Sequence, residues 1–270
     1  MVREALVGRY DIEREIARGG AARVFYARDM EGKPKAVKIL HPELAVTVTA
    51  DRFLREVELL RRLDHPQIAR VIDSGELHWF IYYVMDFIDG PNIRRHLDRV
   101  RRASVSDTQR IADDMLRALG YAHENNIVHR DVKPENVILS ERGAVLLDFG
   151  IAKAIAAAGT TKLTRSGFTV GTSSYMSPEQ VAGADDIDHR SDLYSLGCVL
   201  FECLAGRPPF VHKREETVLH MQQTERAPDV RDLRKETPVG LAKALQRALE
   251  KNREDRWPSS EAMRAALLHA

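Results

Sequence analysis

The eight residues HRDVKPEN, at positions 129–136, are the stretch of this sequence that decides the fold. They bring four charged side chains and one asparagine together in a short segment. Two apolar runs follow, Val137–Leu139 and Val145–Leu147, with turn-forming residues at 141–143 between them. This spacing predicts a β-hairpin, and Asp148-Phe149-Gly150 comes directly after it. Taken alone, the segment is also compatible with a charged turn before a strand, so its meaning depends on the other motifs of the chain.

The N-terminal part of the chain is predicted to contain strands and one helix. Four short apolar runs, bounded by turn signals such as Glu31-Gly32-Lys33-Pro34, are the predicted strands. They are Val24–Ala27, Ala36–Leu40, Arg70–Asp73 and Trp79–Met85. Between the second and the third, Phe53, Val57 and Leu60 recur at helical spacing, which predicts an amphipathic helix near residues 51–63.

The remainder of the chain is predicted to be mainly helical. Asp89-Gly90-Pro91 interrupts the strand pattern, so we expect a smaller N-lobe in residues 1–88 and a larger C-lobe in residues 89–270. Four helices are predicted. The first begins at Ser106–Gln109, which has the spacing of a capping box. The second contains the spaced leucines of Leu193–Leu204 and ends at Gly206, the third contains those of Leu241–Leu249, and the fourth follows Pro258. Residues 154–174 lack periodicity and are rich in hydroxyl side chains, which indicates a long loop of the kind that is either functional or disordered.

Composition narrows the class of protein. The chain has 270 residues, of which 44% are apolar and 30% charged, and this balance favours a soluble protein with a sizeable core. A net charge of +1 gives no sign of a nucleic-acid or membrane surface. No signal peptide or membrane-spanning stretch is evident in the sequence. Cys198 and Cys203 lie five residues apart in a helical apolar pattern, so we expect two buried thiols in a reducing compartment and no metal site.

The motifs together resemble a known family. HRDVKPEN, Asp148-Phe149-Gly150, Ser177-Pro178-Glu179 and Ala36-Val37-Lys38 follow the order found in eukaryotic-type protein kinases, and specifically in their bacterial serine/threonine branch. The resemblance covers nearly the whole chain. It implies an α+β, two-lobed fold, with a small, mostly antiparallel N-lobe that contains one main helix and a larger helical C-lobe. It further implies ATP-dependent phosphorylation of serine and threonine hydroxyls in proteins.

Within this resemblance, the central segment supplies the catalytic groups. Phosphoryl transfer needs positioning, charge neutralisation and an acceptor for the hydroxyl proton. Asp131 matches the base of the family, and Lys133 matches the cation that neutralises the moving phosphoryl group. Asn136 and Asp148 match the oxygen ligands of Mg²⁺, which is a hard cation. The implied cofactors are therefore ATP and Mg²⁺, with Mn²⁺ as a substitute.

Lys38 and Glu56 match the phosphate-binding lysine of the family and its ion-pair partner on the helix. For an arbitrary lysine and glutamate, two unrelated surface charges would be the default interpretation. The apolar neighbours of Lys38 and the matching order of elements favour the functional one. The glycine-rich loop is the weakest match, because Ala17 and Ala22 stand where the family has its first and third glycines. Gly19 holds the middle position, where backbone can approach phosphate closely.

The resemblance also implies a nucleotide pocket in the N-lobe. The residues that match it by alignment are Ala17, Gly19, Val24, Ala36, Lys38 and Met85. Backbone groups of Asp86 and Ile88 would pair with the adenine edge. Met85 is equally typical of simple core packing. In the C-lobe, Glu179 is expected to pair with Arg256, and Asp192 is expected to accept backbone hydrogen bonds from the catalytic loop, both as scaffold.

A regulatory site is implied as well. Arg130, beside Asp131, matches an arginine that grips a phosphorylated loop residue through charge-assisted hydrogen bonds. The loop offers Thr160, Thr161, Thr164, Ser166 and Thr169. Thr164 and Ser166 best match the autophosphorylated positions of bacterial relatives, whereas Thr172 is expected on the substrate side. Alternatively, these hydroxyl residues merely keep a flexible loop soluble.

Two rival functions share the same fold. A pseudokinase would bind partners without turnover, and only the altered glycine loop favours it, since Lys38, Glu56, Asp131, Asn136 and Asp148 are all present. A small-molecule phosphotransferase is disfavoured by the complete activation segment that ends in Ser177-Pro178-Glu179. We therefore expect protein substrates, possible pairing of two copies through the N-lobe, and a cytoplasmic location, either alone or as part of a larger, membrane-anchored protein.

Overall fold

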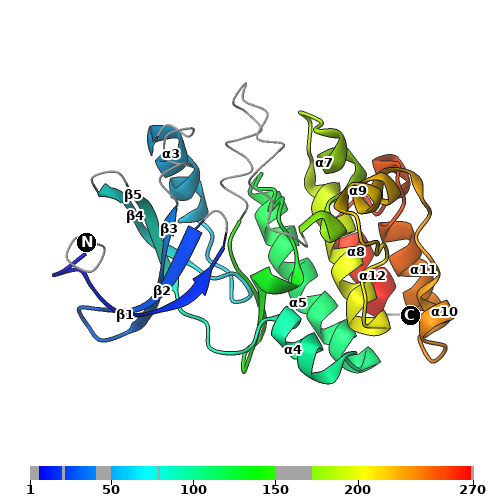
Figure 1. Cartoon of the computed structure of the whole chain (residues 1–270), viewed down its shortest axis with the longest axis horizontal. Coiled ribbons are helices and arrows are strands. Elements are labelled where there is room, and N and C mark those ends of the chain that lie inside the picture. The colour runs from blue at the N-terminus through cyan, green and yellow to red at the C-terminus, as the bar shows by residue number, and fades with distance from the viewer. Residues whose placement is uncertain (1–5, 20–21, 41–49, 78–79, 150–171, 269–270) are drawn as a thin grey trace. The chain divides into compact units, whose positions relative to one another are not determined.

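The computed structural model describes residues 6–19, 22–40, 50–77, 80–149 and 172–268 (Figure 1). Among these, the residues up to Ile88 form one compact unit, and the described residues from Asp89 onward form a second. The first unit is built on an antiparallel sheet and the second is mainly helical, as the resemblance to kinases predicts. Along the described ranges, no helix is both long and apolar enough to cross a membrane.

The sheet of the first unit has five strands in the order β1-β2-β3-β5-β4. They are β1 Tyr10–Arg18, β2 Ala22–Asp29, β3 Pro34–Leu40, β4 Val71–Leu77 and β5 Phe80–Asp86. All neighbouring pairs run antiparallel. The four predicted strands are confirmed, but β1 was not predicted. Its sequence YDIEREIAR carries a charge at five of nine positions, three of them consecutive, so the alternation of apolar and polar residues is not evident in this edge strand.

The two faces of this sheet are covered differently. One face carries a cluster of buried apolar side chains, Leu6, Tyr10, Ile12, Ala27, Val37, Ile39, Tyr82 and Val84. Because side chains alternate along a strand, Ala36 and Lys38 lie on the opposite face from Val37. Helix α3, Ala50–Leu60, packs against part of that opposite face, where its Phe53 ring lies 6.2 Å from the ring of Tyr83. The helix therefore packs on the face of the sheet that carries Lys38.

The apolar face predicted for α3 is confirmed, because Phe53, Val57 and Leu60 are buried. Its predicted end at residue 63 is wrong. The Arg62 N–H donates to Leu59 O at 3.2 Å and the Leu63 N–H to Leu60 O at 3.1 Å. These three-residue turns tighten the chain beyond Leu60, so the α-helix ends there.

The second unit contains most of the helices. They are α4 Ile93–Val100, α5 Val105–Glu124, α7 Pro178–Ala182, α8 His189–Ala205, α9 Glu215–Thr224, α10 Val230–Leu233, α11 Val239–Ala248 and α12 Ser260–Leu268. The predicted hairpin is confirmed as β6 Val137–Ser140 and β7 Gly143–Leu146. The proposed capping box at Ser106 is wrong, because α5 begins two residues earlier. Ser104 is its N-cap and accepts a hydrogen bond from the Asp107 N–H at 2.9 Å.

Helix α8 forms the core of this unit. Every residue from Ser191 to Ala205 is buried, and α5 and α11 pack against the helix (Figure 1). Gly206 ends the helix with a left-handed φ of 80°, which glycine adopts readily. Cys198 and Cys203 are both buried free thiols, as the sequence predicts. Such central burial fits the mainly apolar stretch from Leu193 to Ala205.

Candidate active site

The predicted catalytic residues Asp131, Lys133 and Asn136 lie together in the second unit. The Lys133 Nζ is 2.9 Å from Asp131 Oδ2. The Asn136 Nδ2 donates to Asp131 O at 2.8 Å and to Asp131 Oδ2 at 3.1 Å. A short 3-10 helix, η1 Pro134–Asn136, folds the chain back so that both donors reach the same carboxylate. Because the donors are charged or amide groups, the Asp131 side chain is held in one orientation.

The two predicted metal ligands are joined through the backbone. The Leu147 N–H donates to Asn136 O at 2.8 Å, and Asp148 is the next residue. Asn136 is buried, and since its Nδ2 donates to Asp131, its amide oxygen is left as an acceptor. Asp148 has a left-handed φ of 50°, a conformation that non-glycine residues rarely hold outside functional or tightly determined sites. This donor set of carboxylate and amide oxygens fits Mg²⁺.

The His129 side chain stabilises the catalytic loop through hydrogen bonds, a role that the sequence did not predict. Its Nδ1 accepts the Asp131 N–H at 3.1 Å, so the ring proton lies on Nε2, which faces Leu147 O at 2.8 Å. The ring also lies 4.7 Å from that of Phe149. Burial lowers the pKa of His129, which keeps the imidazole neutral and able to accept at one nitrogen and donate at the other. His129 thereby ties the catalytic loop to the segment that carries Asp148.

Asp192 of α8 holds the start of the loop, as predicted. Its carboxylate accepts the backbone N–H groups of His129 and Arg130, each at 2.8 Å, and lies 2.8 Å from His123 Nε2. Burial alone would raise the pKa of Asp192, but these hydrogen bonds and the neighbouring histidines lower it overall. Arg130 has a φ of 64°, so the loop is held in a strained backbone conformation at its second residue.

The predicted ion pair between Glu179 and Arg256 is confirmed. Both carboxylate oxygens of Glu179 accept from the Arg256 guanidinium at 2.7 Å, and Ser191 Oγ donates to the same carboxylate. The Arg256 side chain is fully buried. The next residue, Gln180, donates from Nε2 to Arg130 O at 2.9 Å, a contact that the sequence did not predict. The end of the activation segment is thus anchored both to the core and to the catalytic loop.

The first unit arranges the candidate nucleotide residues by strand register. Ala17, Val24, Lys38 and Tyr83 are direct partners across β1, β2, β3 and β5, so they share one face of the sheet. Ala36 pairs with Met85 on the same face, two positions along. The Lys38 Nζ lies 5.6 Å from the centre of the Tyr83 ring. Glu56 lies on α3, which packs against part of this face, and its ion pair with Lys38 stays a prediction.

The other candidate nucleotide residues lie at the ends of strands. The Gly19 N–H donates to Ala22 O at 2.9 Å, which joins the end of β1 to the start of β2. The Asp86 N–H donates to Arg70 O at 3.0 Å, so of its two backbone groups only the carbonyl could accept from an adenine. Ile88 is half-buried after β5. The predicted phosphosites Thr164 and Ser166 lie outside the described residues.

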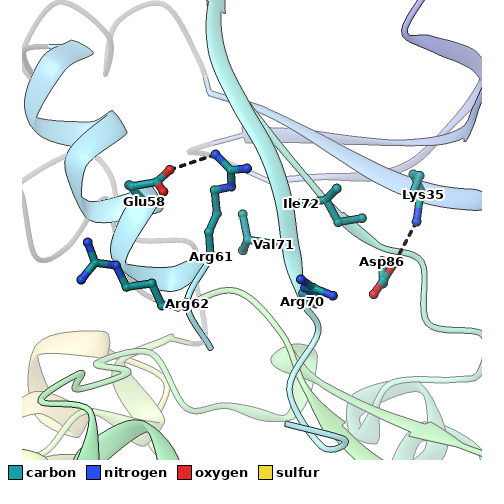
Figure 2. Close-up of a pocket in the computed structure, with 8 residues that line it drawn as sticks. All are labelled: Lys35, Glu58, Arg61, Arg62, Arg70, Val71, Ile72 and Asp86. Carbon is teal, nitrogen blue, oxygen red and sulfur yellow. Dashed lines mark hydrogen bonds and ion pairs between the residues drawn. The ribbon is translucent and has the colours of Figure 1, made fainter. Parts of the chain in front are cut away.

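A charged hollow of about 380 Å³ surrounds the start of β4 in the first unit (Figure 2). Its charged lining consists of Lys35, Glu58, Arg61, Arg62, Arg70 and Asp86. Both carboxylates face basic partners: Glu58 lies 2.9 Å from Arg61 Nη1 and Asp86 lies 3.0 Å from Lys35 Nζ. Figure 2 shows the Lys35 and Asp86 side chains pointing toward each other. Because small-molecule sites are mostly apolar, this hollow does not match the predicted adenine pocket.

Comparisons with known proteins agree with this geometry. The family model described as "Protein kinase domain" matches residues 10–268. A probable serine/threonine-protein kinase of Streptomyces coelicolor is 39% identical over 96% of this chain and 39% of its own length. The serine/threonine-protein kinase PknB of Mycobacterium leprae is 37% identical over 97% of this chain and 43% of its own length. The chain thus spans less than half the length of these relatives.

A solved structure shows the same fold at lower sequence identity. Rad53 1–466, in complex with AMP-PNP, superposes with a TM-score of 0.78 at 22% identity, covering 96% of this chain and 65% of that one. This structural likeness supports the assignment of the fold. The family model and the bacterial relatives support the assignment of the chain to a family. The chain therefore belongs to the protein kinase family, and its relatives by sequence include bacterial serine/threonine-protein kinases.

Proposed function

We propose that this chain transfers the γ-phosphoryl group of ATP to serine and threonine hydroxyls of proteins. The observation that carries the proposal is the arrangement of Asp131, whose carboxylate is held by Lys133 at 2.9 Å and by Asn136 at 3.1 Å. Phosphoryl transfer depends on positioned charge more than on covalent chemistry, and this arrangement supplies a fixed anion beside a fixed cation. The serine/threonine specificity follows the names of the bacterial relatives.

In this proposal, Asp131 orients the substrate hydroxyl and accepts its proton. Its side chain is 15% exposed, so the carboxylate is reachable while its hydrogen bonds stay sheltered. The Lys133 ammonium, 18% exposed, lies close enough to place positive charge beside the transferred group. The contact between the Lys133 Nζ and Asp131 Oδ2 also keeps the carboxylate and the ammonium side by side, as the transfer of a charged group requires.

The metal and the nucleotide have separate proposed binding groups. Asn136 and Asp148 would hold Mg²⁺, or Mn²⁺ in its place, and the ion would neutralise charge on the phosphates. Lys38, held by Glu56, would bind the phosphates of ATP, and the backbone at Gly19, near Ala17 in the sequence motif, would approach them closely. Val24 would cover one face of the adenine. Ala36 and Met85 would line the adenine, whose edge would meet the backbone of Asp86 and Ile88. The shared sheet face of Ala17, Val24, Ala36, Lys38 and Met85 supports this assignment.

The proposed activity is tested with purified protein, ATP and a generic protein substrate. With Mg²⁺ present, we expect phosphate on serine and threonine and none on tyrosine, as measured by phosphoamino-acid analysis. A chelator should abolish the transfer, and Mg²⁺ or Mn²⁺ should restore it better than the larger Ca²⁺, because Ca²⁺ prefers more ligands at longer distances. No transfer under any metal would favour the pseudokinase, and transfer to small molecules alone would favour the second rival.

We further propose that the protein phosphorylates itself at Thr164 and Ser166, and that Arg130 then binds the phosphate. The support is the position of Arg130 beside Asp131, with its backbone held by Asp192 and Gln180. After incubation with Mg-ATP, mass spectrometry of proteolytic fragments should find phosphate at one or both residues. A Thr164→Ala/Ser166→Ala variant should lose it and keep the same fold. If no phosphate is found between residues 154 and 174, autophosphorylation of the loop is contradicted.

Two further expectations stay proposals that rest on the resemblance to kinases. One is that two copies pair through residues 1–88, and the other is that the domain works in the cytoplasm, alone or within a larger, membrane-anchored protein. Sedimentation at increasing protein concentration tests the first. Fractionation of cells that produce the full-length protein tests the second.

A further inference from the structure

Arg94 of α4 lies at the centre of a hydrogen-bond network beside the catalytic loop. Its Nε donates to Glu135 Oε1 at 3.1 Å, and Glu135 immediately precedes Asn136. Its Nη1 and Nη2 donate to the two carboxylate oxygens of Glu202, at 2.7 and 3.2 Å, and Nη2 also contacts the Tyr175 hydroxyl. Tyr175 in turn donates to Glu202 Oε2 at 2.5 Å. One guanidinium thus joins the catalytic loop, the end of the activation segment and α8.

The Arg94 guanidinium and the Glu202 carboxylate of this network stabilise each other's charge. Glu202 is a buried carboxylate on an otherwise apolar stretch of α8, with only 4% of its side chain exposed. Burial alone would lower the pKa of Arg94, but the hydrogen bonds and charge of Glu202 raise it overall, so the guanidinium stays charged. Burial and the Glu202 carboxylate raise the pKa of Tyr175, which therefore stays a neutral donor. Without Arg94, a buried negative charge would lose its partner.

Helix α8 therefore holds both ends of the catalytic loop. At the first end, Asp192 accepts the backbone N–H groups of His129 and Arg130 directly. At the other end, Glu202 reaches Glu135 through Arg94. The two carboxylates are ten residues apart on a rigid buried helix, about 15 Å along its axis. Nearby backbone contacts reinforce the second end, since the Leu139 N–H donates to Pro91 O at 2.8 Å just before α4 begins.

We propose that Arg94 is a positioning residue for phosphoryl transfer, which fixes the Glu135–Asn136 end of the catalytic loop and the Tyr175 segment to α8. The inference rests on the proposed function. Glu135 is fixed by Arg94, Asn136 follows it, and the Asn136 amide orients Asp131. Arg94 itself acts through these residues and is not assigned a contact with substrate. A small displacement at Asn136 would move both a proposed metal ligand and the donor to Asp131, and catalysis is sensitive to such displacements.

The test compares Arg94→Ala with Arg95→Ala, the exposed neighbour on the same helix. We expect Arg94→Ala to lower kcat about tenfold or more, with little change in the KM for ATP. Arg95→Ala should behave like the unaltered protein. The activity of the unaltered protein tests the proposed function separately. A failure of the inference about Arg94 can therefore be distinguished from a failure of the proposed function. Arg94→Ala with undiminished kcat would overturn the inference.

Two further variants separate positioning from folding. Arg94→Lys keeps the charge but not the fork of donors, so it should recover little activity. Added methylguanidinium should restore part of the kcat of Arg94→Ala, because the vacated carboxylates suit a planar cation. If Arg94→Ala does not fold, Glu135→Gln replaces it, since Glu135 is 43% exposed and tolerates change. A kcat for Glu135→Gln equal to that of the unaltered protein, with only a raised KM for the protein substrate, would show a substrate contact and overturn the positioning role.

Discussion

An Asp131→Asn variant is expected to transfer phosphate about 10²–10⁴-fold more slowly than the unaltered protein, which is the range found when a general base is lost. The amide of asparagine keeps the size of the side chain and still has an oxygen to accept from Lys133 and Asn136. It cannot take up the hydroxyl proton. The KM for ATP should change little, because Asp131 is assigned to the substrate hydroxyl. Steady-state rates with a generic protein substrate measure both quantities.

The matched control for this variant is Asp98→Asn, which makes the same chemical change at an exposed position of α4. The control should keep full activity. The melting temperature of Asp131→Asn should stay near that of the unaltered protein, because the hydrogen bonds around residue 131 can be retained. If Asp131→Asn keeps most of its kcat, the assignment of Asp131 as base is wrong, even if the chain is an active kinase.

Replacing Arg256 by methionine is expected to lower the free energy of unfolding by about 3–5 kcal/mol, the range for breaking a buried ion pair on one side. The Arg256 side chain is fully buried and Glu179 is 11% exposed, so the carboxylate left behind could not be solvated in place. Arg256 also donates from Nε to Glu250 O at 2.8 Å and from Nη2 to Lys251 O at 3.0 Å, and those acceptors would be left unsatisfied. Denaturant unfolding measures the difference.

An exposed ion pair supplies the control for Arg256. Arg253 contacts Asp186, whose side chain is 69% exposed, so Arg253→Met should cost no more than about 1 kcal/mol. Equal losses for the two variants would contradict the special role of the buried pair. The double variant Arg256→Met/Glu179→Leu should recover part of the loss, since it removes the stranded carboxylate.

The same pair gives stability a dependence on pH. Burial alone would raise the pKa of Glu179, but the hydrogen bonds and charge of Arg256 lower it overall. A carboxylate with a lowered pKa in the folded state contributes stability above its unfolded pKa, and the contribution is lost as the pH falls through the folded value. The difference in the free energy of unfolding between the unaltered protein and Arg256→Met should therefore become smaller as the pH falls below the ordinary glutamate pKa of 4.5.

The sequence was sufficient for the two-lobed fold because the signals were local. The apolar runs around Lys38 and after Asn136 were enough to predict strands, and the regularly spaced leucines were enough to predict α8 and α11. The catalytic segment was found by its own motif, and the structure then brought Asp131, Lys133 and Asn136 within hydrogen-bond distance. The predicted roles of Asp192 and Glu179 as scaffold were also confirmed, since both lie at motif positions.

What the sequence did not reveal depends on contacts between distant residues. Strand β1 was missed because its charged residues hide the alternation expected of an edge strand. Arg94 was missed because an arginine on a basic helix is usually solvated. Its partner Glu202 lies 108 residues further along the sequence, so only the three-dimensional structure shows the contact. One signal was available: Glu202 is an acidic residue within the apolar run of α8, where a charge needs a buried partner. The bracing roles of His129 and Gln180 likewise required the three-dimensional positions of Leu147 and Arg130.

The burial of α8 has a consequence for the chemical reactivity of the cysteines in this domain. The two cysteines of the chain, Cys198 and Cys203, both lie in that helix, and burial raises the pKa of each thiol to about 12. At physiological pH almost no thiolate forms, and thiolate is the species that oxidants and alkylating compounds attack. We therefore expect Cys198 and Cys203 to react slowly with alkylating reagents as long as the domain stays folded.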